Sequence, residues 1–220
     1  MRKFQFEENQ IYHVYNRGVD RRNIFLNNKD YARFIHYLFE LNNRKKIFNI
    51  GRNLKKGSMI EVQPQSLQRE LLVEVLAFCL MPNHYHLILR QKKENGITKF
   101  MQKIGTGHTM YFNNGNNRDG SLFQGRFKAI LVDKDYYLVH LLNYIHFNPL
   151  KLPNFNISNL EQYRWSSFPD YIGEKNFPSI TSREFLLNFY GSEEKYKKEA
   201  REWLKEKDKN TSIIRDIILE

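Results

Sequence analysis

Four short stretches of the chain carry the aromatic, β-branched and apolar residues that are typical of strands. They are Ile11–Arg17, Leu72–Leu80, His84–Arg90 and Phe127–Val132. The second stretch is apolar almost throughout, which favours a central strand. The turn residues Met81-Pro82-Asn83 follow it, so we expect it to form a hairpin with the third stretch.

Helical spacing of apolar residues predicts three helices between and after these strands. They are expected near Asn28–Leu41, Ile97–Tyr111 and Lys134–Asn148. The second contains Gly105 and Gly107, each of which weakens a helix by about 1 kcal/mol relative to alanine. The third ends where Pro149 removes a backbone donor.

The resulting order, β-α-β-β-α-β-α, predicts an α+β fold of the ferredoxin-like, split βαβ type with one added helix. We expect a four-stranded antiparallel sheet with helices on one face. The first domain is predicted to span residues 1–150, and residues 151–220 are predicted to form a C-terminal extension with an aromatic motif and a charged helix at Glu193–Glu206. Arg44–Ser66 is expected to be a long loop or a small insertion.

The composition predicts that the protein binds a polyanionic partner. Of the 220 residues, 41% are hydrophobic, so the chain can bury a core. The formal net charge is +11, which points to nucleic acid or an anionic membrane surface, although a solvated basic surface is the simpler alternative.

The single cysteine and the apolar runs argue against secretion and membrane insertion. Cys79 stands alone in an apolar segment, so we expect a buried thiol without an intramolecular disulfide. The charged start lacks the apolar core of a signal peptide, and no run approaches the roughly 20 apolar residues that span a bilayer. The chain is expected to be cytoplasmic, with no membrane partner.

Two histidines in one predicted strand form a candidate metal site. His84 and His86 are two residues apart, so their side chains share one face of the strand, while Tyr85 points to the other. Such a pair can chelate a metal ion, but two strand histidines are more often structural or merely exposed. A third ligand must come from elsewhere in the chain.

The third predicted helix could present polar side chains to the two histidines. His140, Tyr144 and Asn148 recur every four residues and form a polar stripe beside the apolar face. Packed over the strand, this helix would present a phenol and an amide oxygen to the histidines. The alternative is that Tyr144 is a boundary aromatic and Asn148 only ends the helix.

Five motifs in order carry a resemblance to a known family. They are YHVYNRG (12–18), LMPNHYHLIL (80–89), LFQGRFKAILV (122–132), YIHFNP (144–149) and YRWSSF (163–168). Together they resemble the REP-associated tyrosine transposases, which are relatives of the insertion-sequence transposases of the single-tyrosine HUH superfamily. The similarity covers roughly residues 10–172. The stretch Arg44–Ser66 is longer than the usual connection in this family.

The resemblance assigns roles residue by residue. His84 and His86 match the pair that binds a divalent metal, Tyr144 matches the nucleophilic tyrosine, and Asn148 matches the polar residue that completes the metal site. It implies Mg²⁺ or Mn²⁺, which also suits a mixture of imidazole and oxygen ligands. The residues themselves show no dedicated base, and His140, one turn before the tyrosine, is a candidate.

This chemistry would cut and rejoin single-stranded DNA. Tyrosine attacks phosphorus and gives a 5′-phosphotyrosine and a free 3′-hydroxyl, which can reverse the step. The metal offsets the charge of the phosphodiester. Hairpin or repeat DNA is the expected target of a monomer or homodimer. The alternatives are a DNA-binding module that does not cut, and a metal-dependent phosphodiesterase that uses water.

Basic and aromatic residues near this site are candidate DNA contacts. Plausible phosphate contacts are Asn16, Arg17, Arg21, Arg22, Arg126 and Lys128. Tyr163, Trp165 and Phe168 offer stacking surfaces for bases. For Trp165, a hydrophobic anchor that docks the extension on the core is an equally good interpretation.

Overall fold

The computed structural model describes residues 5–44 and 69–205 and contains one antiparallel sheet. Its strands are β1 (Ile11–Arg17), β2 (Val73–Met81), β3 (His84–Gln91) and β4 (Lys128–Val132), in the order β2-β3-β1-β4. Helix α1 (Asn28–Glu40) lies between β1 and β2 in the chain, and α3 (Gly96–Gly115) lies between β3 and β4. The predicted split βαβ arrangement is therefore confirmed.

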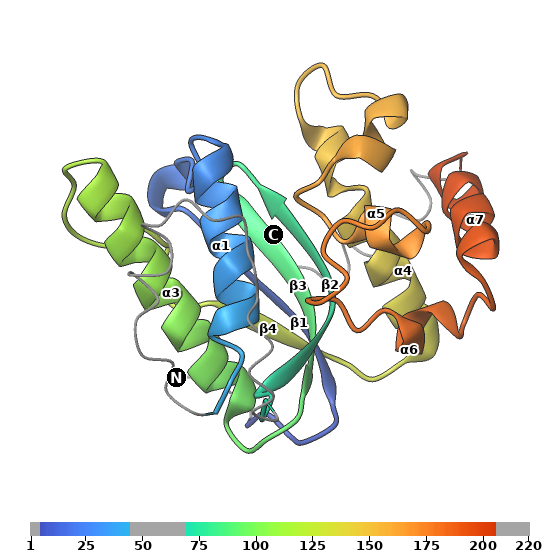
Figure 1. Ribbon diagram of the computed structural model, residues 1–220, viewed down its shortest axis with the longest axis horizontal. Helices are drawn as coiled ribbons and strands as arrows, with labels where there is room; N and C mark the ends of the chain where they lie inside the picture. The colour runs from blue at the N-terminus through green and yellow to red at the C-terminus, as the bar shows by residue number, and fades with distance from the viewer. Residues whose placement is uncertain (1–4, 45–68, 206–220) are drawn as a thin grey trace.

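Helices cover both faces of the sheet, not one face as the sequence pattern suggested. Figure 1 shows α1 and α3 on one side of the strands and α4 (Asp135–His146) on the other, together with the C-terminal extension. Side chains along β3 alternate between the two faces of the sheet. Tyr85 and Leu87 belong to the core under α1 and α3, whereas Ile88 packs under α4. The expectation of helices on a single face was wrong because β1 and β3 carry buried side chains on both.

Strand β2 was expected at the centre of the sheet, yet it lies at the edge. Its free edge is covered by the extension. The backbone N–H of Leu80 donates to Trp165 O (2.8 Å), and Ser167 N–H donates to Phe78 O (3.0 Å). A further bridge joins Val75 to Thr181. Apart from Glu74, the strand is apolar, because neighbours cover both of its faces and its outer edge.

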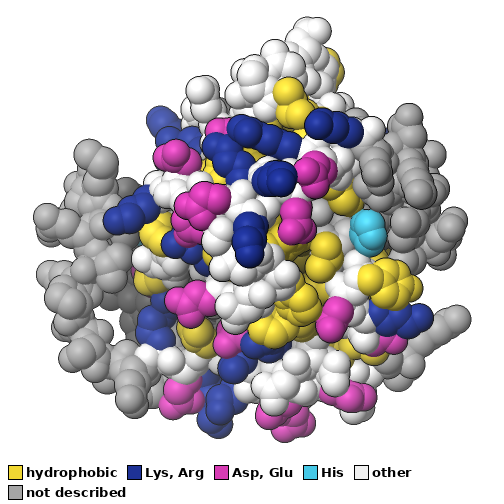
Figure 2. Space-filling view, turned by 90° about the vertical axis from the view of Figure 1, so that its right-hand side faces the viewer, with side chains coloured by type: hydrophobic (Ala, Val, Ile, Leu, Met, Phe, Trp, Pro, Cys, Tyr) yellow, Lys and Arg dark blue, Asp and Glu magenta, His cyan; other side chains and the backbone are white. Residues whose placement is uncertain are grey.

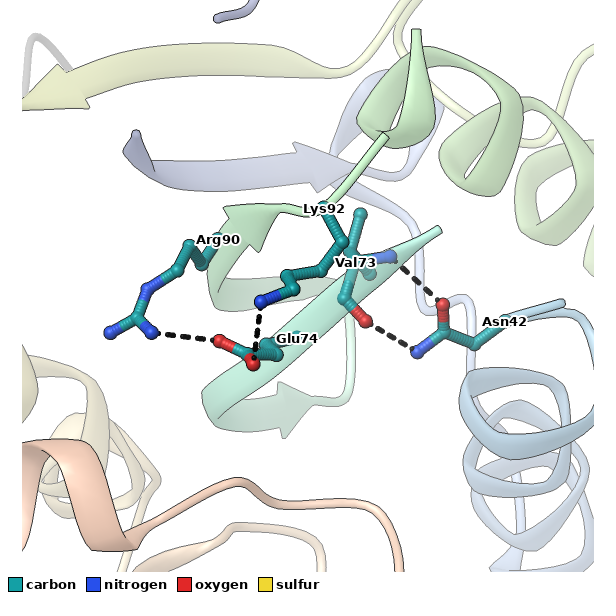
Figure 3. A network of polar contacts seen from close by, with 5 residues as sticks. All are labelled: Asn42, Val73, Glu74, Arg90 and Lys92. Atoms are coloured by element: carbon teal, nitrogen blue, oxygen red, sulfur yellow. Dashed lines mark hydrogen bonds and ion pairs between the residues drawn. The ribbon is translucent and has the colours of Figure 1, made fainter. Parts of the chain in front are cut away.

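Polar side chains join the start of β2 to the end of α1 (Figure 3). The amide of Asn42 accepts from the Val73 N–H (3.1 Å) and donates to its carbonyl (2.8 Å). On the next residue, the Glu74 carboxylate pairs with Arg90 at 2.9 Å and with Lys92 at 3.2 Å. These contacts set where β2 begins, although residues 45–68, which include most of the predicted Arg44–Ser66 insertion, lie outside the described residues.

The extension consists of short elements and one longer helix. It begins with two 3-10 turns, η2 (Asn148–Lys151) and η3 (Ile157–Gln162). Three helices follow: α5 (Phe168–Tyr171), α6 (Glu184–Leu187) and α7 (Glu193–Lys205). Another 3-10 turn, η1 (Val19–Arg21), lies outside the extension, directly after β1. Tyr196 of α7 is fully buried in the core under α4. Figure 2 shows Lys and Arg interspersed with Asp and Glu on this side of the molecule. Among its described residues, Glu161 pairs with Lys197 and Arg201, so the basic charge there is partly balanced.

Two smaller expectations concern burial and membranes. Cys79 is fully buried, as predicted, and burial raises the pKa of its thiol. Among the described residues, none of the helices combines the length and the apolar character that crossing a bilayer requires. The division of the chain near residue 150 stays a prediction.

Candidate active site

Strand β3 presents two imidazoles to the face of the sheet that α4 covers. His84 and His86 lie opposite Arg17 and Tyr15 of β1, and their ring centroids are 5.1 Å apart. Tyr85, between them, is buried in the opposite core. Alternation along one strand therefore brings the two imidazoles together, as the spacing of the motif predicted.

Each imidazole is held at its Nδ1 atom by a neighbour. His84 Nδ1 lies 2.6 Å from Asn83 Oδ1, and His86 Nδ1 lies 2.9 Å from the Nε2 atom of His13 on β1. An amide oxygen only accepts, so His84 donates from Nδ1. Imidazoles that ligate metals are commonly held in this way at the second nitrogen.

Burial keeps the inner imidazoles neutral. His13 and His86 are both fully buried. Burial lowers the pKa of His13 to about 3 and holds the pKa of His86 well below its usual range, with the nearby His84 acting in the same direction. A neutral ring has a lone pair to offer, so the lowered pKa of His86 favours the form that a metal ligand needs.

The added helix brings the tyrosine and the amide to the histidines. The ring centroid of Tyr144 lies 5.7 Å from that of His86 in an edge-to-face arrangement. The helix ends at His146, so Asn148 starts the following 3-10 turn instead of closing the predicted helix. Its Oδ1 atom lies 3.4 Å from His84 Nε2.

The donor set fits a divalent cation. His84 Nε2 and Asn148 Oδ1 lie 3.4 Å apart, a separation at which both atoms could ligate one cation. The Nδ2 atom of Asn148 is buried without a hydrogen-bond partner among the described residues. No cluster of three His, Cys, Asp or Glu side chains occurs in residues 5–44 and 69–205, so a metal site at this point would need a ligand of another type, which the Asn148 amide could supply.

Lys151 stands beside the phenol. Its Nζ atom donates to the Tyr144 hydroxyl oxygen at 2.9 Å and lies 4.3 Å from the ring centroid. The lysine sits on the 3-10 turn that also carries Asn148, so one turn supplies both groups. His140, the candidate base, instead accepts from the Trp203 indole N–H at 3.1 Å.

Some of the predicted DNA contacts lie around this centre. Arg17 and Lys128 line a small cavity of about 60 Å³ together with His84 and His86. Arg126 lines a larger groove along α3, which shares Asn16 and Tyr85 with the small cavity. Arg21 and Arg22 are exposed at the η1 turn. The structure thus brings two of these five basic residues to the histidines.

The other predicted contacts are occupied within the protein. Asn16 is buried, and its amide donates to Gly125 O (3.2 Å). The Tyr163 hydroxyl donates to Leu80 O (2.7 Å). Trp165 is only 8% exposed and stacks on Tyr31 with centroids 4.9 Å apart. Phe168 is buried under α4. For Trp165 the structure therefore supports the anchor interpretation.

Sequence reasoning missed two residues of this centre. His13 lies in the motif YHVYNRG, on β1. Its contact with His86 depends on the pairing of β1 with β3, which the sequence does not display. Lys151 lies two residues after the YIHFNP motif. A lysine after the end of a helix is common, so its position in the sequence does not indicate a role in the site.

The fold and the site define the class of protein to which the chain is similar. A solved structure described as a REP-associated tyrosine transposase bound to a REP hairpin matches 83% of this chain and 90% of its own, with 15% sequence identity and a TM-score of 0.52. At that identity the similarity shows the fold alone. Curated proteins give no match to the chain.

The sequence itself places the chain in a family. The family described as IS200-like transposases matches residues 29–148, more than half of the chain, so the chain belongs to that family. The matched range contains the two histidines, Tyr144 and Asn148. The resemblance drawn from the five motifs is therefore confirmed.

Proposed function

We propose that the protein is a metal-dependent endonuclease and strand transferase that acts on single-stranded DNA through a 5′-phosphotyrosine. The observation that carries this proposal is the convergence of Tyr144, the two histidines of β3 and Asn148 on one face of the sheet. These residues come from three elements, β3, α4 and the turn η2, and β3 is distant from the other two in the sequence. Hairpin or repeat DNA is the proposed target.

The tyrosine supplies the covalent step. The Tyr144 oxygen attacks phosphorus, a P–O bond forms, and the bond from phosphorus to the 3′-oxygen breaks. The phenol loses one proton and the departing 3′-oxygen gains one, so charge balances. The aryl phosphate remains a diester, and attack by a 3′-hydroxyl reverses the step and joins strands.

Lys151 would assist both directions of this reaction. Its ammonium group donates to the oxygen that becomes nucleophile in cleavage and leaving group in joining. A charged donor favours negative charge on that oxygen. The chain thus places a cation at the Tyr144 oxygen, whereas His140 bonds to the Trp203 indole.

His84, His86 and Asn148 would hold the divalent ion. When bound, Mg²⁺ or Mn²⁺ would offset the negative charge of the phosphodiester and orient the scissile bond. The chain's own contribution is the fixed direction of the imidazoles, which Asn83 and His13 hold. Arg17 and Lys128 beside them would bind the flanking phosphates.

The decisive experiment traps the covalent adduct. The full chain is incubated with labelled single-stranded hairpin oligonucleotides and Mn²⁺, and the products are separated on a denaturing gel. We expect a protein–DNA adduct that disappears in Tyr144→Phe, while DNA binding is retained. Tyr137→Phe is the matched control on the same helix, because the buried Tyr137 hydroxyl lacks a hydrogen-bond partner among the described residues.

The same gel separates the alternative functions. A DNA-binding module would retain the hairpin without any product. A phosphodiesterase that uses water would give cleaved DNA without adduct, and Tyr144→Phe would still cut. Adduct that persists in Tyr144→Phe would assign the nucleophile to another tyrosine.

A further inference from the structure

A groove on the α3 side of the sheet has no role in the chemistry described above. Its volume is about 790 Å³, within the range of pockets that hold drug-sized ligands, and a nucleotide is of that size. One wall is α3, and the other is the segment from Ser121 to Phe127 that precedes β4. Tyr85 and Met101, both buried, form part of its floor.

The wall formed by α3 is an uncharged stripe. Its residues recur three and four positions apart, which puts them on one face of the helix: Thr98, Gln102, Gly105, Thr106, Thr109 and Met110. Met110 is 60% exposed. The lysines of the same helix, Lys99 and Lys103, do not line the groove. The helix therefore separates its charges from this face.

The opposite wall adds aromatic surface and one cation. Phe123 and Phe127 line the groove, and Arg126 is the single charged side chain among its described lining residues. A site for phosphates would present several cations. Hydroxyl, amide and aromatic groups with one arginine instead suit nucleobases, which stack on rings and bond at their edges.

The groove continues into the candidate active site. Asn16 and Tyr85 border both the groove and the small cavity that contains His84 and His86. The Asn16 amide donates to the Gly125 carbonyl, which lies where the groove meets the small cavity. A strand bound at the histidines can thus pass the end of the sheet at Gly125 and enter the groove.

Gly105 supports the presence of a ligand. A glycine weakens the middle of a helix relative to alanine. A Cβ atom at Gly105 would meet nothing within 4 Å, and its backbone is helical, so neither packing nor conformation requires glycine there. The missing side chain leaves the groove open at its middle.

We propose that this groove binds the unpaired nucleotides that flank the scissile phosphate and contacts their bases more than their phosphates. This rests on the proposed function for the identity of the DNA as substrate. The histidine side would then hold the phosphate that is cut, and the α3 side would hold the neighbouring bases. The groove would contribute the preference for one single strand over another.

The test compares two glycines of the same helix. Gly105→Phe fills the groove, whereas Gly115→Phe adds the same ring at the exposed end of α3, where a Cβ atom also meets nothing within 4 Å. Binding is measured by fluorescence anisotropy in the Tyr144→Phe background, so that no adduct forms. The probes are a 20-nucleotide single strand of randomised sequence and a strand of equal length made of abasic nucleotides.

We expect the chain with Gly115→Phe to bind the normal strand at least tenfold more tightly than the abasic strand. Gly105→Phe should lose that preference while its affinity for the abasic strand stays unchanged. Because Gly105→Phe is a large change, Gln102→Glu gives a second variant on an exposed position, with Asn114→Asp as the control of equal charge outside the groove.

Two outcomes would overturn the proposal. In the first, both phenylalanine variants keep the same preference for bases, so the groove does not hold them. In the second, Gly105→Phe weakens both strands equally, which would make the groove a phosphate site. Neither outcome depends on adduct formation, so a failure of the proposed chemistry and a failure of this groove can be told apart.

Discussion

The two faces of the sheet are built by the same strands but differ in what they bury. Under α1 and α3, the core is a continuous set of aromatic and aliphatic side chains, with His108 bonded to the Ile24 carbonyl at 2.8 Å. Under α4, the strands contribute His13 and His86, and the chain after them adds Asn148 and other buried polar groups. One face stabilises the fold, and the other combines packing with the proposed active site.

This difference teaches where the protein tolerates buried polar groups. A buried polar side chain is unfavourable unless a partner satisfies it. On the α4 face the partners are mostly other polar side chains: His13 bonds to His86, and His146 bonds to both Tyr196 (2.6 Å) and Ser167 (2.8 Å). We therefore expect mutations on the two faces to separate function from stability.

The largest effect is expected at the metal site. His84→Ala combined with His86→Ala removes two of the three proposed ligands and should lower the rate of adduct formation on the order of 10³-fold. Calorimetry with Mn²⁺ should show lost binding. His36→Ala on α1 is the control and should change neither result. Unchanged Mn²⁺ affinity in the double variant would make the histidine pair structural.

The next largest effect is expected where the C-terminal extension packs against α1. Trp165 belongs to the extension yet stacks on Tyr31 of α1, so Trp165→Ala should lower the free energy of unfolding by about 3–5 kcal/mol. Urea denaturation measures this. Tyr163→Phe, which removes the hydroxyl that donates to Leu80 O, should lower the free energy of unfolding by about 1 kcal/mol. Weaker DNA binding at unchanged stability in Trp165→Ala would instead favour the stacking role for this residue.

His13 and His108 allow a direct comparison of the faces. Both are fully buried imidazoles, but only His13 touches a proposed ligand. His13→Leu should weaken Mn²⁺ binding about 10–100-fold, the usual effect of losing the partner of a ligating histidine. His108→Leu should leave that affinity unchanged. His13→Asn, whose amide oxygen can accept from His86, should restore part of it. Equal losses in both leucine variants would contradict a specific role for His13.

The smallest effect is a dependence of stability on pH. Burial lowers the pKa of His146 to about 3 and that of His108 to about 4. Below pH 6.5 the unfolded chain binds protons that the folded chain does not, so stability is fully present above pH 6.5 and is lost as pH falls toward 3. Each histidine contributes a slope of up to about 1.4 kcal/mol per pH unit.

His146→Leu and His108→Leu should each flatten this slope, which thermal denaturation between pH 7 and 5 can measure. Because one histidine lies on each face, the two variants report on the faces separately. A slope that neither variant changes would assign the acid sensitivity to other groups.

The local pattern of the sequence was enough for the elements and for the main site residues. Alternation placed His84 and His86 on one face of a strand, and helical spacing put Tyr144 on the helix after β4. The family motifs then related the two. These features depend on neighbours within a few residues, which a sequence displays directly.

Tertiary structure alone decided the position of β2 and the partners of the site. The apolar pattern of β2 is the same for a central strand and for an edge strand that is covered by a distant segment, so the pattern could not distinguish them. For the same reason, the contact of His13 with His86, 73 residues apart, and the burial of Trp165 against Tyr31 were not predictable. Pairing between distant segments depends on how the whole chain closes its core, and no local spacing records it.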